Sequence, residues 1–138
     1  MEAVSEVLLR NRQVLGRGPI YLVNPAPDYL AKELQESTRG IEVFTQDYGH
    51  QHWFEELGTP CKFGVFPVVP ARTTLVILRL AREKERFETL LRAVAASIPP
   101  TARLWVVGEK RAGIQSAPKR IRKFFDTVSK KDSARHCT

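Results

Sequence analysis

Residues 24–28, Asn-Pro-Ala-Pro-Asp, follow the apolar segment 20–23 and stand where a strand–loop–helix unit would bind a nucleotide or cofactor. Loops of that kind need glycine, which permits positive φ and lets a ligand approach the backbone N–H groups. Pro25 and Pro27 do the opposite, because proline fixes φ and has no N–H to offer. We therefore predict that this loop binds no cofactor and that Asp28 caps the following helix.

The next candidate residues follow the apolar segment 41–45. Asp47 stands near the position at which an acidic residue often holds a ribose in such folds, although it lies past the apparent strand end. His50 and His52 are two residues apart, and no third metal ligand is identifiable beside them. We favour a polar loop anchored by Trp53 over a metal or ribose site.

The two cysteines and the known catalytic motifs add no reactive group. Cys61 and Cys137 lie in neither a CxxC motif nor a Cys/His cluster, so we favour two reduced thiols, with a disulfide as the alternative. The sequence contains no GxSxG, P-loop or HExxH pattern. The local motifs therefore predict neither catalysis nor a bound metal.

Positive charge is concentrated in the last segment of the chain. The formal net charge is +7. Residues 108–138 hold nine Lys and Arg against three acids, or +6, so the first 107 residues contribute only +1. Such a segment favours polyanions, because binding them releases condensed counterions. A solvated surface that only aids solubility is the alternative.

Strand-like and helix-like segments alternate along most of the chain. We predict strands at 20–24, 41–45, 62–66, 74–80 and 103–107, and helices at 28–37, around 52–57, around 87–98 and from near 116. This alternation is typical of an α/β fold with a mostly parallel, Rossmann-like sheet and helices on both faces. Ligands of such sheets bind at the carboxyl ends of the strands, which are the loops described above.

Length and composition fit one domain that spans residues 1–138. The sequence is 43% hydrophobic and 27% charged, which is ordinary for a globular protein. No apolar run approaches the roughly 20 residues that span a bilayer, and the N-terminus lacks the pattern of a signal peptide. We expect a cytoplasmic protein with no membrane partner.

Three stretches together resemble one protein family. These are SEVLLRN (5–11), LWVVGEKRAGIQSAPKRI (104–121) and KKDSARHC (130–137). They are similar to the N-terminal half of bacterial 16S rRNA guanine-N2 methyltransferases, the C-type small-subunit enzymes. The resemblance implies a class I methyltransferase-type fold, and partners that include 16S rRNA, or the small ribosomal subunit, and a C-terminal catalytic domain of the same chain.

In that family the C-terminal domain carries the glycine-rich S-adenosylmethionine loop and an Asn-Pro-Pro-Phe catalytic motif, and neither motif is present here. The resemblance puts Pro25 and Pro27 in the degenerate cofactor loop and residues 79–84 in the catalytic loop. It implies that S-adenosylmethionine binds the absent C-terminal domain and that no cofactor binds this one. We expect a domain-length fragment that stops before the closing antiparallel strand of the fold.

Our leading hypothesis is a non-catalytic, rRNA-contacting domain that supports a catalytic domain. Its phosphate-binding residues would be the basic side chains of the last segment: Lys110, Arg111, Lys119, Arg120, Arg122, Lys123, Lys130, Lys131 and Arg135. Tyr48 and Trp53 are candidates for stacking on bases, whereas Trp105 fits the core better. The alternatives are an active S-adenosylmethionine-dependent methyltransferase with an atypical loop, and a folding or dimerisation scaffold.

Overall fold

The computed structural model describes residues 2–80, 84–108, 114 and 117–125. Its strands are β1 (Ile20–Val23), β2 (Ile41–Thr45), β3 (Cys61–Phe63), β4 (Leu75–Arg79) and β5 (Arg103–Val107). They form one sheet in the order β3-β2-β1-β4-β5, and every neighbouring pair is parallel. The order reverses between β1 and β4, so the switch point of the sheet lies beside the loops that follow these two strands. The predicted α/β fold is confirmed.

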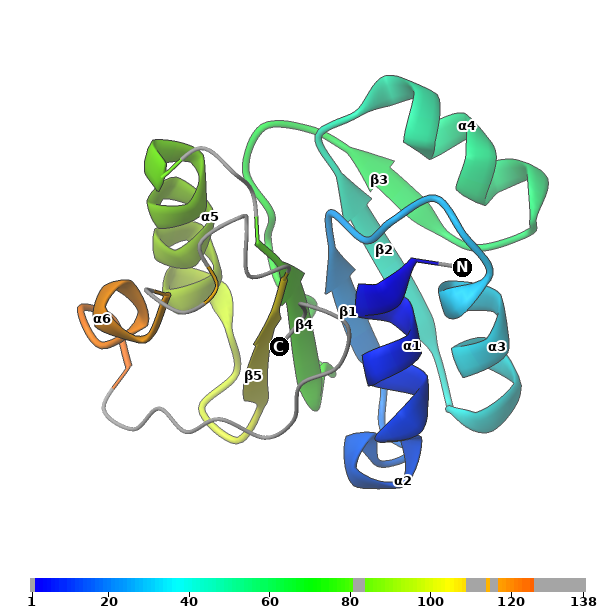
Figure 1. Cartoon of the computed structure of the whole chain (residues 1–138), viewed down its shortest axis with the longest axis horizontal. Coiled ribbons are helices and arrows are strands. Elements are labelled where there is room, and N and C mark those ends of the chain that lie inside the picture. Colours follow the sequence, from blue (N-terminus) through cyan, green and yellow to red (C-terminus); the bar gives the residue numbers. More distant parts are fainter. Residues whose placement is uncertain (1, 81–83, 109–113, 115–116, 126–138) are drawn as a thin grey trace.

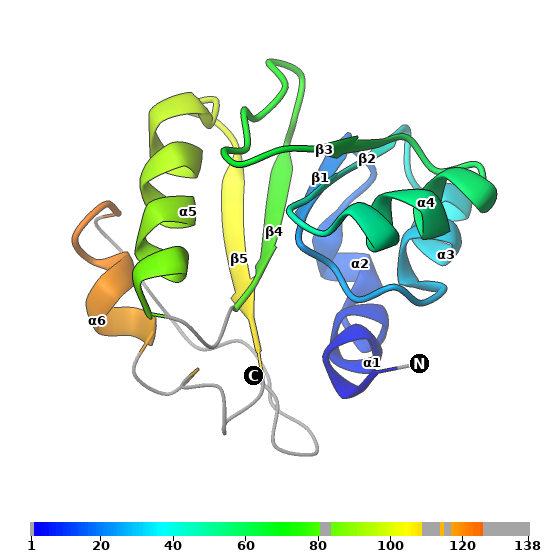
Figure 2. The same ribbon diagram turned by 90° about the horizontal axis from the view of Figure 1, so that it is seen from above.

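Helices cover both faces of this sheet (Figures 1 and 2). On one face lie α1 (Ala3–Arg10), α2 (Arg12–Leu15), α3 (Leu30–Ser37) and α4 (Tyr48–Glu56), and on the other lie α5 (Lys84–Ser97) and α6 (Ala117–Ile121). No helix of the described part of the chain is long and apolar enough to cross a membrane.

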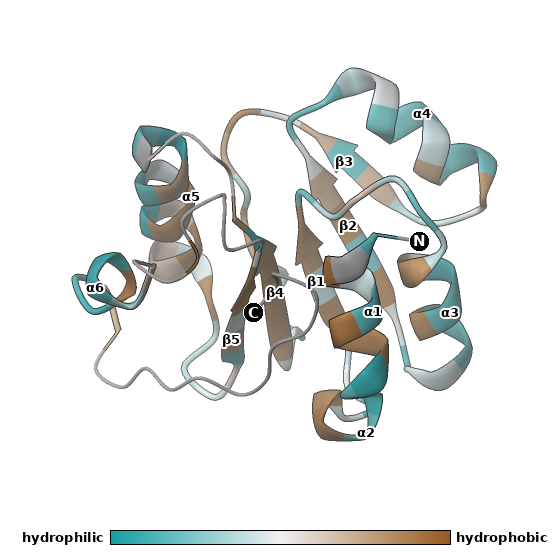
Figure 3. Cartoon of the chain, viewed as in Figure 1, coloured by the Kyte–Doolittle hydropathy of each residue, from teal (hydrophilic) through white to brown (hydrophobic). Residues whose placement is uncertain are grey.

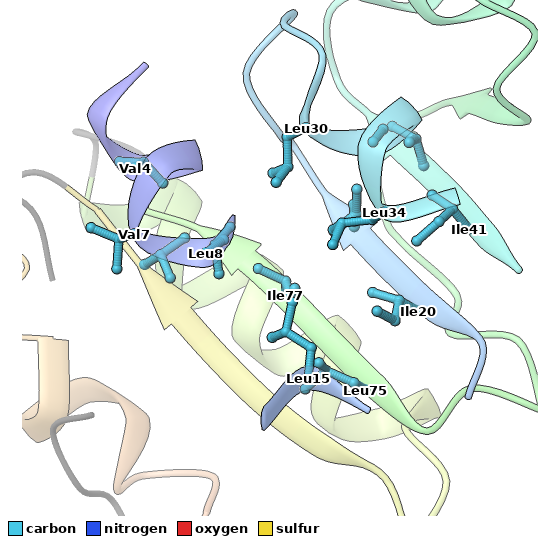
Figure 4. Packing of buried hydrophobic residues seen from close by; sticks show 14 of the residues in the cluster. Val4, Val7, Leu8, Leu15, Ile20, Leu30, Leu34, Ile41, Leu75 and Ile77 are labelled. Carbon is cyan, nitrogen blue, oxygen red and sulfur yellow. The ribbon is translucent and has the colours of Figure 1, made fainter. Parts of the chain in front are cut away.

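Each face of the sheet has its own hydrophobic core. Figure 4 shows the first, in which Val4 and Leu8 of α1 and Leu34 of α3 pack on Ile20 and Ile77 of the central strands. Successive residues of a strand point to opposite faces, so Tyr21 and Val23 enter the second core, under Phe87, Leu90, Leu91 and Val94 of α5. Strands buried on both faces appear as continuous hydrophobic bands in Figure 3.

Three predicted segments differ at their ends. Strand β3 covers 61–63 rather than 62–66, because the chain leaves the sheet at Gly64. Helix α4 begins at Tyr48 rather than near residue 52, because Asp47 caps it. The last helix, predicted from near 116, is limited to the short α6, which turns at 122–124.

The connection from β3 to β4, residues 64–74, contains no helix. We call it the strap. It crosses the sheet on the α5 side, where its Val69 joins Tyr21 and Phe44 in the second core. The strap thus shares the cover of that face with α5, and it is thinner than a helix.

Candidate functional site

The carboxyl ends of β1 and β2 are joined to each other by their own side chains. The backbone of Asn24 is left-handed, with φ of 51°, a conformation that asparagine tolerates better than most residues. Its Nδ2 donates to Gln46 Oε1 at 3.0 Å, and its Oδ1 accepts from the Gln46 backbone N–H at 2.9 Å. The backbone N–H of Asn24 also donates to the Phe44 carbonyl at 2.8 Å. These bonds use polar groups that a ligand between the two loops would otherwise contact.

Asp28 joins the first loop to two helices at once. Its Oδ1 accepts from the backbone N–H of Leu30 at 3.0 Å at the start of α3, but the N-cap residue of that helix is Tyr29, so the predicted cap at Asp28 is wrong by one position. Its Oδ2 accepts from the Ser5 hydroxyl at 2.7 Å and from the Glu2 backbone N–H at 3.2 Å. A carboxylate is stabilised beside helix N-termini because their N–H groups lack partners within the helix. Ser5 is buried, so this link lies inside the molecule.

The end of β4 is joined to the same helix start. Arg79, the last residue of β4, donates from Nη2 to Glu2 Oε1 at 2.8 Å, and both side chains are partly buried. The N-terminus of α1 therefore bonds to the loop after β1 through Asp28 and to the end of β4 through Glu2. These contacts and the Asn24–Gln46 pair link the carboxyl ends of β1, β2 and β4 to neighbouring parts of the protein by hydrogen bonds. The links lie at the switch point, where ligands of this fold bind.

The other sequence candidates near this edge have structural roles. Asp47 accepts from the His50 backbone N–H at 3.0 Å as the cap of α4. His52 packs edge-on against Tyr48, with ring centroids 4.7 Å apart. Trp53 packs on the first core and on Tyr29, which confirms its predicted anchoring role. Within the described residues, no group of three or more His, Cys, Asp or Glu side chains could hold a metal ion.

Burial and, to a smaller extent, the nearby Glu55 carboxylate together raise the pKa of the Cys61 thiol to about 11. The reactive form of cysteine is the thiolate. In the Cys137→Ser variant, we therefore expect alkylation of Cys61 by iodoacetamide at pH 8 to be about 200-fold slower than in the unfolded chain, whose thiol has a pKa of about 8.5.

The alkylation rate should still rise about tenfold between pH 9 and pH 10, because the folded thiol is far from its pKa. A rate that levels off by pH 9 would contradict the shift. The same shift makes the free energy of unfolding depend on pH. Because the pKa of Cys61 is higher in the folded state, the stability is unchanged below about pH 8.5 and decreases as the pH rises towards 11.

The basic residues predicted to bind phosphate fall into two groups. Lys110, Arg111, Lys130, Lys131 and Arg135 lie outside the described residues. The other four come from α6 and the turn after it, and they are Lys119, Arg120, Arg122 and Lys123. Lys119 and Arg122 are exposed, whereas Arg120 is largely covered. The structure thus gathers these four on one short segment beside α5.

Glu88 of α5 holds two of these cations. Lys123 Nζ donates to its Oε1 at 3.0 Å, and Arg120 Nε lies 3.8 Å from the same oxygen. The hydrogen bond from Lys123 lowers the pKa of Glu88, and the charges of Lys123, Arg120 and Arg92 lower it further. A carboxylate therefore competes with any phosphate for part of this basic surface.

Sequence reasoning missed three residues of this edge, Glu2, Ser5 and Gln46, and with Glu2 it missed the partner of Arg79. One signal was available for Gln46, because an amide side chain follows each of two neighbouring strands, at 24 and at 46. The links of Glu2 and Ser5 span 26 and 23 residues in sequence to Asp28, and that of Arg79 spans 77 residues to Glu2. No local pattern marks such contacts.

Comparisons with known proteins identify the family and the fold. The family model described as "Methyltransferase small domain N-terminal" matches residues 5–138. Ribosomal RNA small subunit methyltransferase C of Acinetobacter baylyi is 34% identical over 99% of this chain, and that of Shewanella sediminis is 31% identical over 96%. The chain spans only 39% and 40% of the length of these two relatives.

Two solved structures share the fold. The T. thermophilus 16S rRNA N2 methyltransferase RsmC, in complex with AdoMet and guanosine, matches with a TM-score of 0.75 at 18% identity, over 95% of this chain and 36% of its own. A TehB-like SAM-dependent methyltransferase of Corynebacterium glutamicum matches with a TM-score of 0.70 at 10% identity, over 89% of this chain and 73% of its own. Both likenesses show a class I methyltransferase-type sheet.

Proposed function

Because the chain belongs to the methyltransferase small domain N-terminal family, we propose that it is the non-catalytic N-terminal domain of a 16S rRNA guanine-N2 methyltransferase. In this role residues 1–138 form one domain that supports a C-terminal catalytic domain and contacts rRNA of the small ribosomal subunit. The methyl donor S-adenosylmethionine would bind the catalytic domain. Contact with rRNA would place the protein in the cytoplasm.

The observation that carries this proposal is that hydrogen bonds within the protein occupy the carboxyl edge of the sheet. A donor-binding edge of this fold presents free backbone N–H groups and glycines. Here Pro25 and Pro27 stand in the loop, Asn24 bonds to Gln46, and the start of α1 bonds to Asp28 and to Arg79. A donor would have to break several of these bonds, and nothing in the described part of the edge would replace them.

Isothermal titration of the chain with S-adenosylmethionine tests this directly. We expect no heat of binding at donor concentrations that saturate the full-length Acinetobacter baylyi relative, which serves as the positive control. A saturable heat with the 138-residue chain would support the alternative of an active methyltransferase with an atypical loop and would overturn the non-catalytic role.

The proposed rRNA contact rests on the basic surface of α6. Lys119, Arg120, Arg122 and Lys123 lie within five consecutive residues, and phosphate contacts of this kind give affinity with little sequence choice. Filter binding with 16S rRNA fragments should show an affinity that falls linearly with salt on logarithmic axes. If the chain retained 16S rRNA fragments no better than it retains generic polyanions, the scaffold alternative would be favoured.

Replacing Glu88 by glutamine should strengthen RNA binding. The change removes the carboxylate that competes for Lys123 and Arg120, so about one more phosphate is neutralised. We expect an affinity about fivefold higher at 0.1 M salt and a salt slope steeper by roughly 0.7 for single strands. The matched control is Glu85→Gln, a change of equal charge at an exposed position of the same helix. Equal gains in the two variants would show a general charge effect instead.

A further inference from the structure

Large hydrophobic side chains gather on the outside of the strap and of the neighbouring edge strand. Val65, Phe66 and Val68 are 67%, 61% and 72% exposed, and Phe63 at the end of β3 and Tyr48 of α4 are about half exposed. The rings of Tyr48 and Phe63 pack edge-on, with centroids 5.6 Å apart. We call these five residues the strap surface. Of the seven large hydrophobic side chains that are exposed in the described part of the chain, five belong to it.

The strap is held firmly, so this exposure is a property of a formed surface. Its Val65 carbonyl accepts from Gln46 Nε2 at 2.8 Å, and its Gly64 N–H donates to the Thr45 carbonyl at 3.1 Å. At the other end, the Val69 N–H donates to Ser97 Oγ at 2.9 Å, and the Val69 side chain is buried. The strap thus directs one set of side chains inward and presents another set to solvent.

The chemistry of the strap surface fits a protein partner better than RNA. Residues 63–71 carry no charged side chain. The adjacent Lys62 lies 3.6 Å from Glu42, which offsets its charge. Two of the five residues are valines, which cannot stack on bases as aromatic rings do. The basic α6 lies at the opposite end of the sheet, beside α5 (Figures 1 and 2). An exposed apolar patch of this kind marks a contact with another apolar surface.

We propose that the strap surface docks onto the second, catalytic domain of the longer polypeptide. The inference rests on the proposed function and names the surface through which the domain gives its support. The chain spans about two fifths of its curated relatives, so most of their polypeptide lies outside the matched segment and is the nearest available partner. Helices cover the other face of the sheet, whereas on the α5 face the second core combines Val69 of the strap with side chains of α5 and α6, so the strap is the part of this cover that is not a helix.

Hydrogen exchange tests the proposal in two proteins that share the same strap. One is the 138-residue chain. The other is the full-length Acinetobacter baylyi relative with its matched segment replaced by this chain. Backbone amides of residues 63–69 should exchange at least tenfold more slowly in the longer protein, whereas those around Val14 of α2 should exchange equally in both.

Substitutions then assign the protection to the strap surface. The double variant Phe66→Asp, Val68→Asp in the longer protein should restore the fast exchange, and so should Val65→Asp alone. The matched control is Val14→Asp, because this valine is also about half exposed but lies on the far face. Circular dichroism of each variant shows whether the domain is still folded, and the single Val65 change keeps the test decisive if the double variant unfolds.

Several results would overturn the proposal. Equal exchange in the short and long proteins would show that no domain covers the strap. If protection from exchange in the 138-residue chain increased with protein concentration, a second copy of the chain would be the occupant of the strap surface. If protection appeared only with added rRNA, the strap surface would be a base-stacking surface. A heat of binding with S-adenosylmethionine, or a lack of RNA binding, would instead damage the proposed function and leave the exchange result standing.

Discussion

Replacing Asp28 by alanine is expected to lower the free energy of unfolding by about 4 kcal/mol. The change removes the acceptor of the Leu30 N–H at the start of α3, a bond comparable to a helix cap, which is typically worth about 1 kcal/mol. It also leaves the buried Ser5 hydroxyl and the Glu2 N–H without their acceptor, and bonds to a charged group contribute roughly 1.5–3 kcal/mol each. Urea denaturation followed by circular dichroism measures the loss.

The control for this experiment is Asp47→Ala, which removes a cap from α4 at an exposed position. Because the Asp47 side chain accepts from only one backbone N–H, that of His50, we expect the free energy of unfolding to fall by only about 1 kcal/mol. Asp28→Asn should fall between the two, since it keeps an acceptor oxygen but loses the charge. Equal losses for Asp28→Ala and Asp47→Ala would show that the link to α1 adds nothing.

Replacing Lys119 and Arg122 together by glutamine is expected to weaken binding of single-stranded 16S rRNA fragments about 25-fold at 0.1 M salt. Both side chains are exposed, and each is expected to neutralise one phosphate. Losing two such contacts reduces the salt slope by about 1.4, and that slope difference corresponds to the stated factor at 0.1 M. Filter binding at several salt concentrations gives the affinity and the slope together.

A matched control removes equal charge from another face. Lys32 and Arg39 are exposed and belong to α3 and the turn after it, on the side of the sheet away from α6. Their double replacement by glutamine should leave the salt slope within about 0.3 of the unmodified chain, because distant charges are screened at this ionic strength. If both pairs weakened binding alike, affinity would come from net charge, and the α6 surface would not be an RNA site.

Sequence periodicity was sufficient for most of the architecture. The continuous apolar runs at 20–23 and 75–79 belong to strands buried on both faces, and their composition indicates this without any knowledge of neighbours. The ends of β3 and α4 were harder to predict. Their limits depend on where the chain leaves the sheet at Gly64 and on a cap that Asp47 supplies, and both are set by local geometry that periodicity does not resolve.

For the candidate site, too, some features were predictable from the sequence and others were not. Two prolines in the first loop were enough to predict that it offers no cradle of backbone N–H groups, since this follows from the chemistry of proline alone. A side-chain acceptor near the start of α3 was also predictable from the residue type of Asp28, although the N-cap itself is Tyr29. The exposed apolar face of the strap was not, because alternation within Phe63–Val69 does not tell which side chains find a core beneath them.

The sequence by itself determined the α/β frame, the loop without glycines and the basic character of the last segment, because these follow from residue type and spacing. Only the tertiary structure decided that Asn24 bonds to Gln46, that α1 closes the edge through Asp28 and Arg79, and that Glu88 holds Lys123 and Arg120. Each of these contacts joins residues more than 20 positions apart. Such pairs meet only after the sheet has formed and its two cores have fixed the helices against it.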